Sequence, residues 1–493
     1  MSQTNQDLEH YFNTFRKQTI GIDQTIQTPY GRYPLIYMDW TASGRLYRPI
    51  EKKMIEVVGP WISNTHTEHS STGQLMTECY HHAKQIIRAH VNASEDDLIL
   101  PVGSGTTDAL NKLQRLISIR VPASLNQSFL LEPEQRPVIF TSLMEHHSNY
   151  LSWCETIGDV VVIPLTKHHQ IDQEQLEHAL IRYQDRPVKI GAFTACSNVT
   201  GIQTNYNQLA KLMHQYNGLC FIDFAASAPY VPINMHPNDE LSYLDGIAFS
   251  AHKFLGGPGA SGILIVNRHC LTNDVPDQPG GGTVLFTNKW GDYQYLHDIE
   301  AREDGGTPAI LQTIRAALAI QLKEKMTTKL IDKREQEMMQ YFLPRLAQIR
   351  DINILAYPVQ AKRLGIISFV VKGKHHHLIA KLLNDRFGIQ VRSGCACAGP
   401  YGHSLLNLSK AYSNKMVEMF KKGDQSFRPG WIRISLHPII QNQELDYLLY
   451  ALQNIVEHYD TWAIDYHYDK HSDKFSHRFS SQNPSLIRAL YDE

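Results

Sequence analysis

The feature of this sequence that most constrains its fold is a regular alternation of short apolar runs with longer helical patterns, between about residues 35 and 270. The runs at 189–194, 219–223 and 262–266 are apolar on both faces and are followed by small or polar residues. Strands of this kind form parallel sheets that helices cover on both faces. The pattern therefore predicts an α/β fold with a mostly parallel sheet, and such sheets bind ligands at the carboxyl ends of their strands.

The length of the chain predicts more than one packed unit, because a single hydrophobic core stops growing at ~250–300 residues and this chain has 493. A long helical pattern begins near residue 308, and further apolar runs follow at 366–371 and 431–435, with a polar loop expected through the 410s and 420s. The predicted divisions are an N-terminal arm (1–34), a large domain (35–307), a bridging helix with a smaller α+β domain (308–455) and a polar C-terminal extension (456–493).

Charge and cysteine content narrow the class of protein. The 47 Lys and Arg residues nearly balance the 49 Asp and Glu residues, so no overall basic field attracts nucleic acid or an anionic membrane. Seven cysteines, an odd number in a long chain, do not form the dense framework of small secreted domains. The chain begins with polar residues and has no apolar stretch near 18 residues. These features predict a soluble, cytoplasmic protein with reduced thiols and with no nucleic-acid or membrane partner.

Glycine and hydroxyl residues follow the predicted strand that ends near residue 102. The sequence Gly103-Ser104-Gly105-Thr106 leads into a helical pattern, and such a helix start presents free N–H groups and hydroxyls to an anion such as phosphate. Residue 108 is an aspartate, so the segment matches neither the ATP-binding nor the NAD-binding glycine pattern. Helix capping explains this turn equally well when it is taken alone.

Two charged residues, Asp223 and Lys253, also follow apolar segments. Asp223 ends an apolar run, where an unpaired carboxylate would be costly, so a cationic partner is expected. Lys253 lies in Ser250-Ala251-His252-Lys253, before a glycine-rich loop, where burial would favour the neutral amine that Schiff-base chemistry needs. A capping aspartate and a solvated surface lysine are the alternative interpretations.

Two more polar turns belong to the same pattern. His146 follows the apolar run that ends at Thr141, and its ring could stack on a flat aromatic ligand. Asn198 lies in the polar turn 197–201, whose amide could hold a carboxylate or phenolate oxygen. Ordinary turn chemistry explains either residue alone. All of these segments follow successive strands of one predicted sheet, however, and together they predict a single site at its carboxyl edge.

The order and local sequences of these segments resemble the class V aminotransferase group of pyridoxal-phosphate (PLP) enzymes, particularly its cysteine desulfurase and selenocysteine lyase branch. The likeness covers about residues 35–440, and its most specific element is Ser250-x-His252-Lys253 with the glycine-rich loop that follows. The resemblance implies the PLP-dependent transferase fold (fold type I), in which the large domain binds the cofactor.

The same resemblance implies a role for each motif in cofactor binding. Lys253 would carry PLP as a Schiff base, Asp223 would pair with the ring nitrogen, and His146 would stack on the ring. The residues implied to hold the phosphate are Ser104, Gly105, Thr106, Ser250 and His252. Thr307 resembles a threonine that a neighbouring subunit lends to the phosphate, which implies a homodimer with shared active sites.

Substrate binding is implied for residues of both predicted domains. Asn198 matches a residue near the substrate carboxylate. Arg392 and Arg433 resemble family positions that bind the same carboxylate, a task that suits the fork of donors of a guanidinium. An exposed strand-end arginine is the alternative interpretation for each.

The run from Arg392 to Ala398, Arg-Ser-Gly-Cys-Ala-Cys-Ala, resembles the desulfurase pattern Arg-Thr/Ser-Gly-x-x-Cys-Ala, which places Cys397 at the nucleophile. The resemblance implies that cysteine or selenocysteine joins PLP as an external aldimine, that Lys253 removes its α-proton, and that the Cys397 thiolate attacks the sulfur. Alanine and a persulfide would result, and a sulfur-acceptor protein would be a partner. Inert loop thiols and a transient disulfide with Cys395 are the alternatives, and no metal site is expected because the other cysteines lack partner spacing.

Two departures from the pattern leave the reaction open. Ala226 stands where desulfurases usually place glutamine, and residues 399–430 form an insertion that could reshape the substrate entrance. A PLP-dependent aminotransferase, an epimerase or another C–S lyase with an incidental cysteine pair is the enzymatic alternative, because a shared frame does not fix the reaction. A sulfur-carrier or scaffold protein that kept the fold is the non-enzymatic one. Histidines 375–377 are expected to begin a solvated helix.

Overall fold

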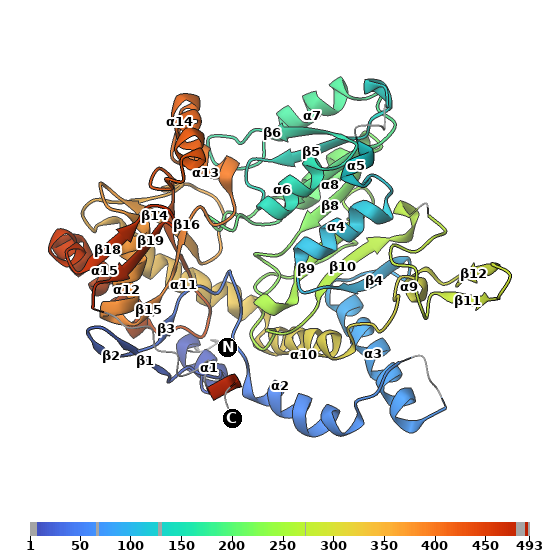
Figure 1. The fold of residues 1–493 in the computed structure, drawn as a ribbon, viewed down its shortest axis with the longest axis horizontal. Coiled ribbons are helices and arrows are strands. Elements are labelled where there is room, and N and C mark those ends of the chain that lie inside the picture. The colour runs from blue at the N-terminus through green and yellow to red at the C-terminus, as the bar shows by residue number, and fades with distance from the viewer. Residues whose placement is uncertain (1–6, 66–68, 127–130, 272, 480–488, 492–493) are drawn as a thin grey trace, which may run out of the picture.

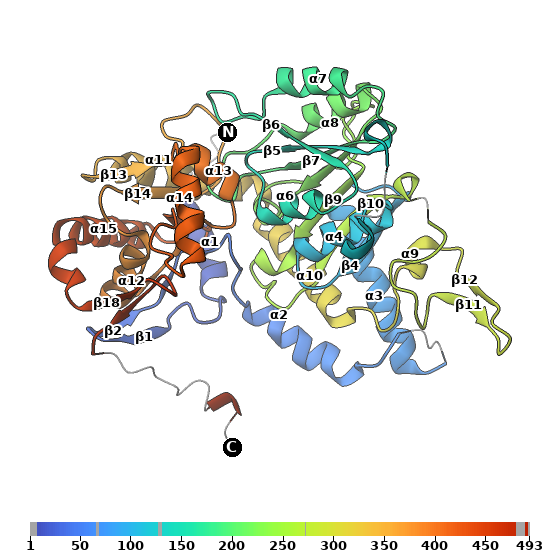
Figure 2. The ribbon, with the colours of Figure 1, turned by 45° about the horizontal axis from the view of Figure 1, so that its top comes forward.

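The computed structural model describes residues 7–65, 69–126, 131–271, 273–479 and 489–491. The described chain forms a large lobe around a wide sheet and a smaller lobe that contains most of the C-terminal third, with the N-terminal segment beside it (Figures 1 and 2). No helix in these ranges is long and apolar enough to cross a membrane.

The large lobe is built on a seven-stranded sheet with the strand order β4-β10-β9-β8-β7-β5-β6. The strands are β4 (Asp97–Val102), β5 (Val138–Ser142), β6 (Asp159–Ile163), β7 (Lys189–Thr194), β8 (Leu219–Asp223), β9 (Gly246–Ser250) and β10 (Gly262–Asn267). Strands β6, β5, β7, β8 and β9 pair in parallel, whereas β10 is antiparallel to both of its neighbours. The prediction of a mostly parallel α/β sheet is confirmed.

Hydrophobic clusters lie on both faces of this sheet. Phe221 and Ile222 are neighbours in β8 but belong to different clusters, because successive side chains of a strand point to opposite faces. The helices of this lobe are α3 (Ser71–His90), α4 (Thr106–Leu116), α5 (Ala123–Asn126), α6 (His147–Cys154), α7 (Gln173–Arg182), α8 (Tyr206–Gln215), α9 (Ile299–Arg302) and α10 (Ile310–Met326). The hairpin of β11 (Val284–Thr287) and β12 (Tyr293–Tyr295) projects from the same lobe (Figure 1).

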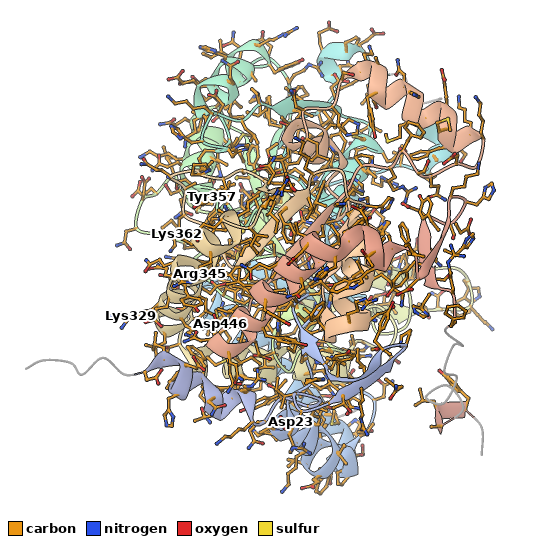
Figure 3. The ribbon with its side chains drawn as sticks, turned by 90° about the vertical axis from the view of Figure 1, so that its left-hand side faces the viewer. Asp23, Lys329, Arg345, Tyr357, Lys362 and Asp446 are labelled. Carbon is orange, nitrogen blue, oxygen red and sulfur yellow. The ribbon has the colours of Figure 1, made fainter. Side chains whose placement is uncertain are left out.

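The smaller lobe has a four-stranded antiparallel sheet with the order β13-β14-β17-β16. Its elements are α11 (Thr328–Ala347), β13 (Ile352–Ile354), β14 (Ile366–Val371), α12 (His376–Phe387), β15 (Ile389–Gln390), β16 (Arg392–Gly394), α13 (Gly399–Leu405), α14 (Lys410–Lys421), β17 (Trp431–Ser435), α15 (Asn442–Ala463), β18 (Tyr466–Asp469) and β19 (Lys474–His477). Figure 3 views a face of this lobe, where the guanidinium of Arg345 lies over the ring of Tyr341 and the Tyr341 hydroxyl donates to Asp446.

Most of the N-terminal segment packs against the smaller lobe, whereas its last helix contacts α10 of the large lobe. The elements of the segment are α1 (Leu8–Arg16), β1 (Thr25–Thr28), β2 (Gly31–Pro34), β3 (Ile36–Tyr37) and α2 (Arg48–Lys52). Leu8, Phe12 and Phe15 of α1 join the hydrophobic cluster that also contains residues of α11, α12 and α15. Strand β3 pairs in parallel with β15, with Ile36 opposite Ile389. This pairing brings the residues that follow β3 close to β16 and β17.

The structure corrects three local expectations. The expected single bridging helix is two helices, α10 and α11, because Thr327 between them has a left-handed φ of 57°. The first part of the stretch expected as a polar loop through the 410s and 420s forms α14, whose first turn is capped by Ser409 and which buries no side chain. The last helix, α15, runs to Ala463 and is followed by the hairpin of β18 and β19.

Candidate functional site

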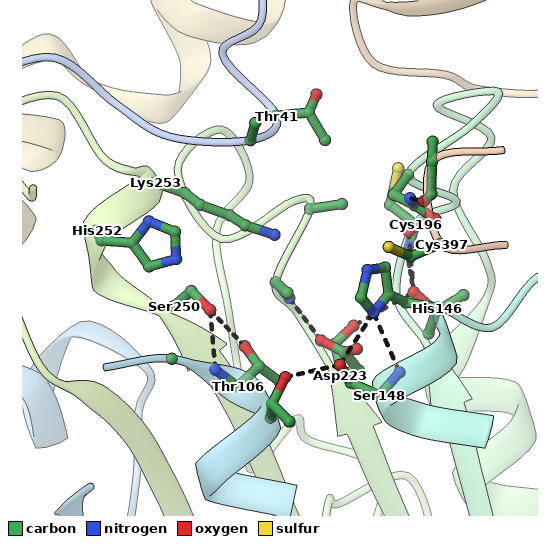
Figure 4. Close-up of a pocket in the computed structure, with 18 of the residues that line it drawn as sticks. Thr41, Thr106, His146, Ser148, Cys196, Asp223, Ser250, His252, Lys253 and Cys397 are labelled. Carbon is green, nitrogen blue, oxygen red and sulfur yellow. Dashed lines mark hydrogen bonds between the residues drawn. The ribbon is translucent and has the colours of Figure 1, made fainter. Parts of the chain in front are cut away.

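A cavity of about 360 Å³ lies at the carboxyl ends of the central strands, where the two lobes meet. Figure 4 shows Lys253, His252 and Ser250 on one side of it and His146 and Cys397 on the other. The predicted site residues that line it are Ser104, Gly105, Thr106, His146, Asn198, Asp223, Ser250, His252, Lys253, Arg392, Cys397 and Arg433. Segments that are far apart in the sequence therefore meet at one edge of the sheet.

One end of the cavity is the turn between β4 and α4. The Thr106 N–H donates to the Ser250 hydroxyl at 2.9 Å, and the two hydroxyls lie 2.8 Å apart. A Cβ built on Gly105 would lie 3.1 Å from the Ser250 oxygen and 3.7 Å from Nε2 of His252, so the glycine keeps this space open. The two hydroxyls and the positive end of the α4 dipole, beside a glycine that leaves room, suit this turn to an anion.

The lysine and the aspartate lie on neighbouring strands. Lys253 ends a short helical turn directly after β9, and Asp223 is the last residue of β8. Burial lowers the pKa of Lys253 to about 8, with the charge of Asp223 acting in the opposite direction. Burial raises the pKa of Asp223, against a hydrogen bond of 2.7 Å from the Ala225 N–H and the charge of Lys253. Part of the Lys253 amine is therefore neutral near pH 8. A cationic ligand beside Asp223 would stabilise the charged form of its carboxylate.

His146 is the N-cap of α6, and its Nδ1 accepts a hydrogen bond from the Ser148 N–H at 3.1 Å. Burial, assisted by the charge of Lys253, lowers the pKa of His146 to about 3. The ring is therefore neutral, and because Nδ1 accepts, its proton sits on Nε2. For the same two reasons the pKa of His252 falls to about 4.

The two arginines of the smaller lobe share one carboxylate. Arg433 Nη2 donates to Asp39 Oδ1 at 2.8 Å, and Arg392 Nε and Nη2 each lie 3.0 Å from Asp39 Oδ2. Arg433 also donates through Nη1 to the carbonyl oxygen of Asn198 at 3.1 Å. Arg392 is exposed at the first position of β16 rather than at the end of the preceding strand, whereas Arg433 is buried in β17. A carboxylate in the cavity would meet both guanidinium groups.

The cysteine loop is held in an unusual conformation. Ala396 and Cys397 have left-handed φ angles of 48° and 56°, and each such non-glycine residue costs about 1–3 kcal/mol. Asn198 Nδ2 donates to the Ala396 carbonyl at 2.7 Å, and the His147 N–H donates to the Cys397 carbonyl at 2.8 Å. The Gly399 N–H in turn donates to His147 Nε2 at 2.9 Å. These contacts hold an exposed Cys397 at the cavity wall.

One predicted residue lies elsewhere, and several site residues were not predicted. Thr307 does not line the cavity; its hydroxyl lies 3.4 Å from Nδ2 of Asn64. Cys395 is half-buried and does not line it either. Asp39 and His147 hold the arginines and the cysteine loop, although neither was singled out as a site residue. Asp39 lies in the sequence Tyr-Met-Asp-Trp. The signal that could have identified it is the position of an acidic residue directly after a short apolar run.

The residues present fit pyridoxal phosphate. Its phosphate, ring nitrogen and aldehyde call for an anion-binding turn, a carboxylate and an amine, and the cavity offers these at Gly105, Asp223 and Lys253. Two further lining atoms, Asn198 Oδ1 and Thr41 Oγ1, are buried without a hydrogen-bond partner among the residues that the structure describes. Buried polar atoms of this kind are normally satisfied, which indicates that the cavity is shaped for a polar ligand.

Comparison with known proteins gives the same answer. Residues 36–448 match the family model described as aminotransferase class-V. A probable cysteine desulfurase of Halalkalibacterium halodurans is 30% identical over 375 residues, which cover 74% of this chain and 85% of that protein. A probable cysteine desulfurase of Staphylococcus aureus (strain Mu50) is 28% identical over 370 residues, with 74% and 84% covered.

Solved structures share the fold. The apo cysteine desulfurase of Thermococcus onnurineus aligns with a TM-score of 0.68 and 23% identity, covering 86% of this chain and 95% of that one. The Escherichia coli cysteine desulfurase CsdA in its S-sulfonic acid form aligns with a TM-score of 0.69 and 20% identity, covering 90% and 98%.

The fold and the cavity define a PLP-dependent enzyme of fold type I. The chain belongs to the aminotransferase class-V family, and the two relatives described above, at 30% and 28% identity, are named as probable cysteine desulfurases.

Proposed function

We propose that this enzyme removes sulfur from cysteine, or selenium from selenocysteine, and holds the sulfur as a persulfide on Cys397. The observation that carries the proposal is that Cys397, exposed and held in a left-handed conformation, lines the same cavity of about 360 Å³ as Lys253. An aminotransferase or epimerase has no need for a thiol held in this way.

The cofactor would be held by groups from several strands. The turn of Ser104, Gly105 and Thr106, with Ser250 and His252, would bind its phosphate, Asp223 would pair with its ring nitrogen, and His146 would stack on its ring. Lys253 would hold it through its amine. When bound, pyridoxal phosphate supplies an electron sink that stabilises the charge left on the substrate carbon.

The substrate carboxylate would lie between Arg392 and Arg433. These guanidinium groups are kept in place by Asp39, at distances of 2.8–3.0 Å, and the unpartnered Asn198 Oδ1 is available to the substrate ammonium or a hydroxyl. Fixed in this way, the substrate would present its α-proton to Lys253 Nζ. The lowered pKa of Lys253 leaves part of the amine neutral near pH 8, as a proton acceptor requires.

Cys397 would perform the transfer itself. Its thiolate would attack the substrate sulfur, the bond between that sulfur and the substrate carbon would break, and the carbon would take up a proton to give alanine. Thiolate is the nucleophilic form of cysteine, and exposure of Cys397 gives access to a second protein that accepts the sulfur. A sulfur-acceptor protein is thus part of the proposal.

The proposal also covers the oligomeric state of the enzyme and the cellular compartment in which it works. Thr307 stands away from the cavity of its own chain, as expected of a residue that serves the site of a partner subunit in a homodimer. All seven cysteines are free, which favours the reducing cytoplasm as the compartment.

The test is to incubate the PLP-loaded enzyme with cysteine and to measure alanine, sulfide and the absorption band of the bound cofactor. We expect alanine and, with a thiol reductant, an equal amount of sulfide. Lys253→Ala should lose the band that borohydride also removes, and Cys397→Ser should keep the band but lose alanine formation. Cys395→Ser is the matched control and should keep both.

Each alternative has its own result. A protein that never acquires the band is a scaffold or carrier. An enzyme that binds the cofactor but forms alanine from neither cysteine nor selenocysteine is another class V enzyme, such as an aminotransferase or epimerase. Undiminished sulfide release by Cys397→Ser would mean a C–S lyase without a persulfide.

A further inference from the structure

A second group of chemically active side chains lies in the smaller lobe, outside the cavity described above. The N-terminus of α12, with His375, His376 and His377, meets the turn of the β18–β19 hairpin, where Asp473 is located. His376 is 8% exposed and Asp473 is 7% exposed. The expectation that these histidines begin a helix is confirmed, but they are not solvated, because the hairpin covers them: Tyr468 and Phe475 pack on the His375 ring.

These side chains gather potential ligand atoms at one point. His376, His377 and Asp473 each offer one nitrogen or oxygen atom, and the three atoms lie within 4.8 Å of one another. His377 Nε2 lies 3.3 Å from Asp473 Oδ2. Bonds from zinc to nitrogen or oxygen measure about 2.0–2.2 Å, so ligand atoms around one ion stand about 3.3–3.5 Å apart. A small rotation of the side chains would bring the three atoms to that spacing.

Two polar atoms in this group are buried but form no hydrogen bond with the residues that the structure describes. They are His376 Nε2 and Asp473 Oδ2. The ring of His377 lies close to Asp473 Oδ2, yet the contact lacks the geometry of a hydrogen bond. A buried carboxylate oxygen and a buried imidazole nitrogen left unpaired are costly, and a bound ion is one of the few things that explains both.

The surrounding contacts suit metal ligands. His377 Nδ1 lies 2.7 Å from the Ser393 hydroxyl, which can accept its proton and leave the Nε2 lone pair facing Asp473. The Tyr468 hydroxyl donates to Asp473 Oδ1 at 3.0 Å. Metal ligands are usually fixed by such partners on their far side.

His375 stands apart from the other two histidines. Its side chain caps α12 by accepting the His377 N–H at Nδ1. The neutral ring therefore carries its proton on Nε2, the atom that lies 3.7 Å from Asp473 Oδ1. A nitrogen that carries a proton has no lone pair for a metal, which makes His375 a natural control.

We propose that His376, His377 and Asp473 bind a divalent transition-metal ion, and that zinc suits this set best. Two imidazoles and one carboxylate, with a water in the fourth position, are a ligand set that zinc favours. The ion would join α12 to the C-terminal hairpin. Ser393, the partner of His377, lies in β16 beside Arg392, so the ion would also steady the strand from which that arginine projects.

The test is zinc binding by the PLP-loaded, chelator-dialysed enzyme, measured by competition with a chromophoric chelator. We expect one zinc per chain. Asp473→Asn and His377→Gln should each weaken the affinity by about 10–100-fold or more, because even outer partners of metal ligands matter on that scale. Asn tolerates the left-handed φ of 55° at residue 473, so this variant keeps the turn. His375→Asn should bind zinc as the wild type does, because Asn keeps the helix cap.

Amide hydrogen exchange gives a second readout. Zinc should slow exchange across residues 466–477 in the wild type and in the Cys395→Ser/Cys397→Ser double variant, but not in Asp473→Asn. The proposal is overturned if the wild type binds no zinc tighter than ~10 µM, about 7 kcal/mol. It is also overturned if Asp473→Asn and His377→Gln bind zinc as tightly as the wild type, or if zinc is lost only when the two cysteines are replaced.

Discussion

His147 holds the loop of Cys397 through two hydrogen bonds that run in opposite directions. The backbone N–H of His147 donates to the Cys397 carbonyl at 2.8 Å, and the His147 ring accepts the Gly399 N–H at Nε2 at 2.9 Å. Since Cys397 and Ala396 both adopt left-handed conformations, the loop depends on such contacts to keep its thiol at the cavity.

Replacement of His147 should therefore impair the sulfur-transfer step more than substrate binding. In His147→Ala the Gly399 N–H loses its acceptor, at a cost of about 1–3 kcal/mol. We expect the kcat of alanine formation to fall by ~10-fold or more, with the KM for cysteine and the cofactor band unchanged. Steady-state kinetics separate these quantities.

A glutamine at the same position provides the matched control. Its side-chain oxygen reaches about as far as Nε2 and can accept the Gly399 N–H, so His147→Gln should recover most of the lost kcat. The exposed His178 serves as a neutral site, and His178→Asn should behave as the wild type. Equal losses in the Ala and Gln variants would show that this hydrogen bond does not position the loop.

Asp39 should be important for stability as well as for the site. Arg433 is buried at 3% exposure, and removal of one partner of a buried ion pair costs about 3–5 kcal/mol. Asp39→Asn should lower the free energy of unfolding by about 3 kcal/mol, measured by urea denaturation of the cofactor-loaded enzyme. Asp23→Asn, at an exposed position labelled in Figure 3, should change it by less than about 0.5 kcal/mol. A loss no larger than that of the Asp23 variant would mean that Asp39 does not neutralise the arginines.

Asp223 should determine how tightly the cofactor is retained. Its buried carboxylate has a raised pKa, and a cationic ring nitrogen would stabilise the charged form. In Asp223→Ala the loss of one partner of a buried charged pair costs about 2–5 kcal/mol, so the cofactor should dissociate on dialysis and activity should fall at least ~30-fold. Asp108→Ala is not a suitable control, because Asp108 accepts the Ser104 N–H in the phosphate turn. The exposed Asp239 is suitable, and retention of cofactor by Asp223→Ala to the same extent as by Asp239→Ala would refute the pairing.

The reactivity of Lys253 should depend on pH in a defined direction. Burial lowers its pKa from 10.5 to about 8, so the neutral amine increases as pH rises and predominates above pH 8. The rate at which apoenzyme takes up pyridoxal phosphate should rise between pH 7 and 8 and level off above that, followed by absorbance. A midpoint near 10.5 would show a solvated lysine.

The lowered pKa of Lys253 should also make the stability of the folded apoenzyme depend on pH. Between pH 8 and 10.5 the unfolded chain binds more protons than the folded one, so the apoenzyme should gain stability with rising pH relative to Lys253→Met.

The sequence predicted the parts of the site that follow directly from strand ends. Ser104, Asp223 and Lys253 each come just after an apolar run, and because parallel sheets bind ligands at their carboxyl edges, the sequence alone predicts that they lie together. Asp39 was missed as a site residue because its partner Arg433 is 394 residues away. That contact depends on the pairing of β3 with β15, and two-residue strands leave no periodic signal.

Two other differences between prediction and structure leave no signal in the local sequence. The break between α10 and α11 occurs at Thr327, and neither glycine nor proline marks it. The sequence predicted solvated histidines at 375–377 because polar residues precede them. The hairpin at 466–477, which is distant in the sequence, packs on them and shields them from solvent. Both features depend on tertiary packing that a local pattern does not encode.

The most direct test of the central claim is peptide mass spectrometry of the cofactor-loaded enzyme after one turnover with cysteine and no reductant. The account predicts an added sulfur atom on the peptide that contains Cys397, one equivalent of alanine, and an intact modification in Cys395→Ser. An added sulfur on Cys395 alone, or alanine without any sulfur bound to either cysteine, would contradict it.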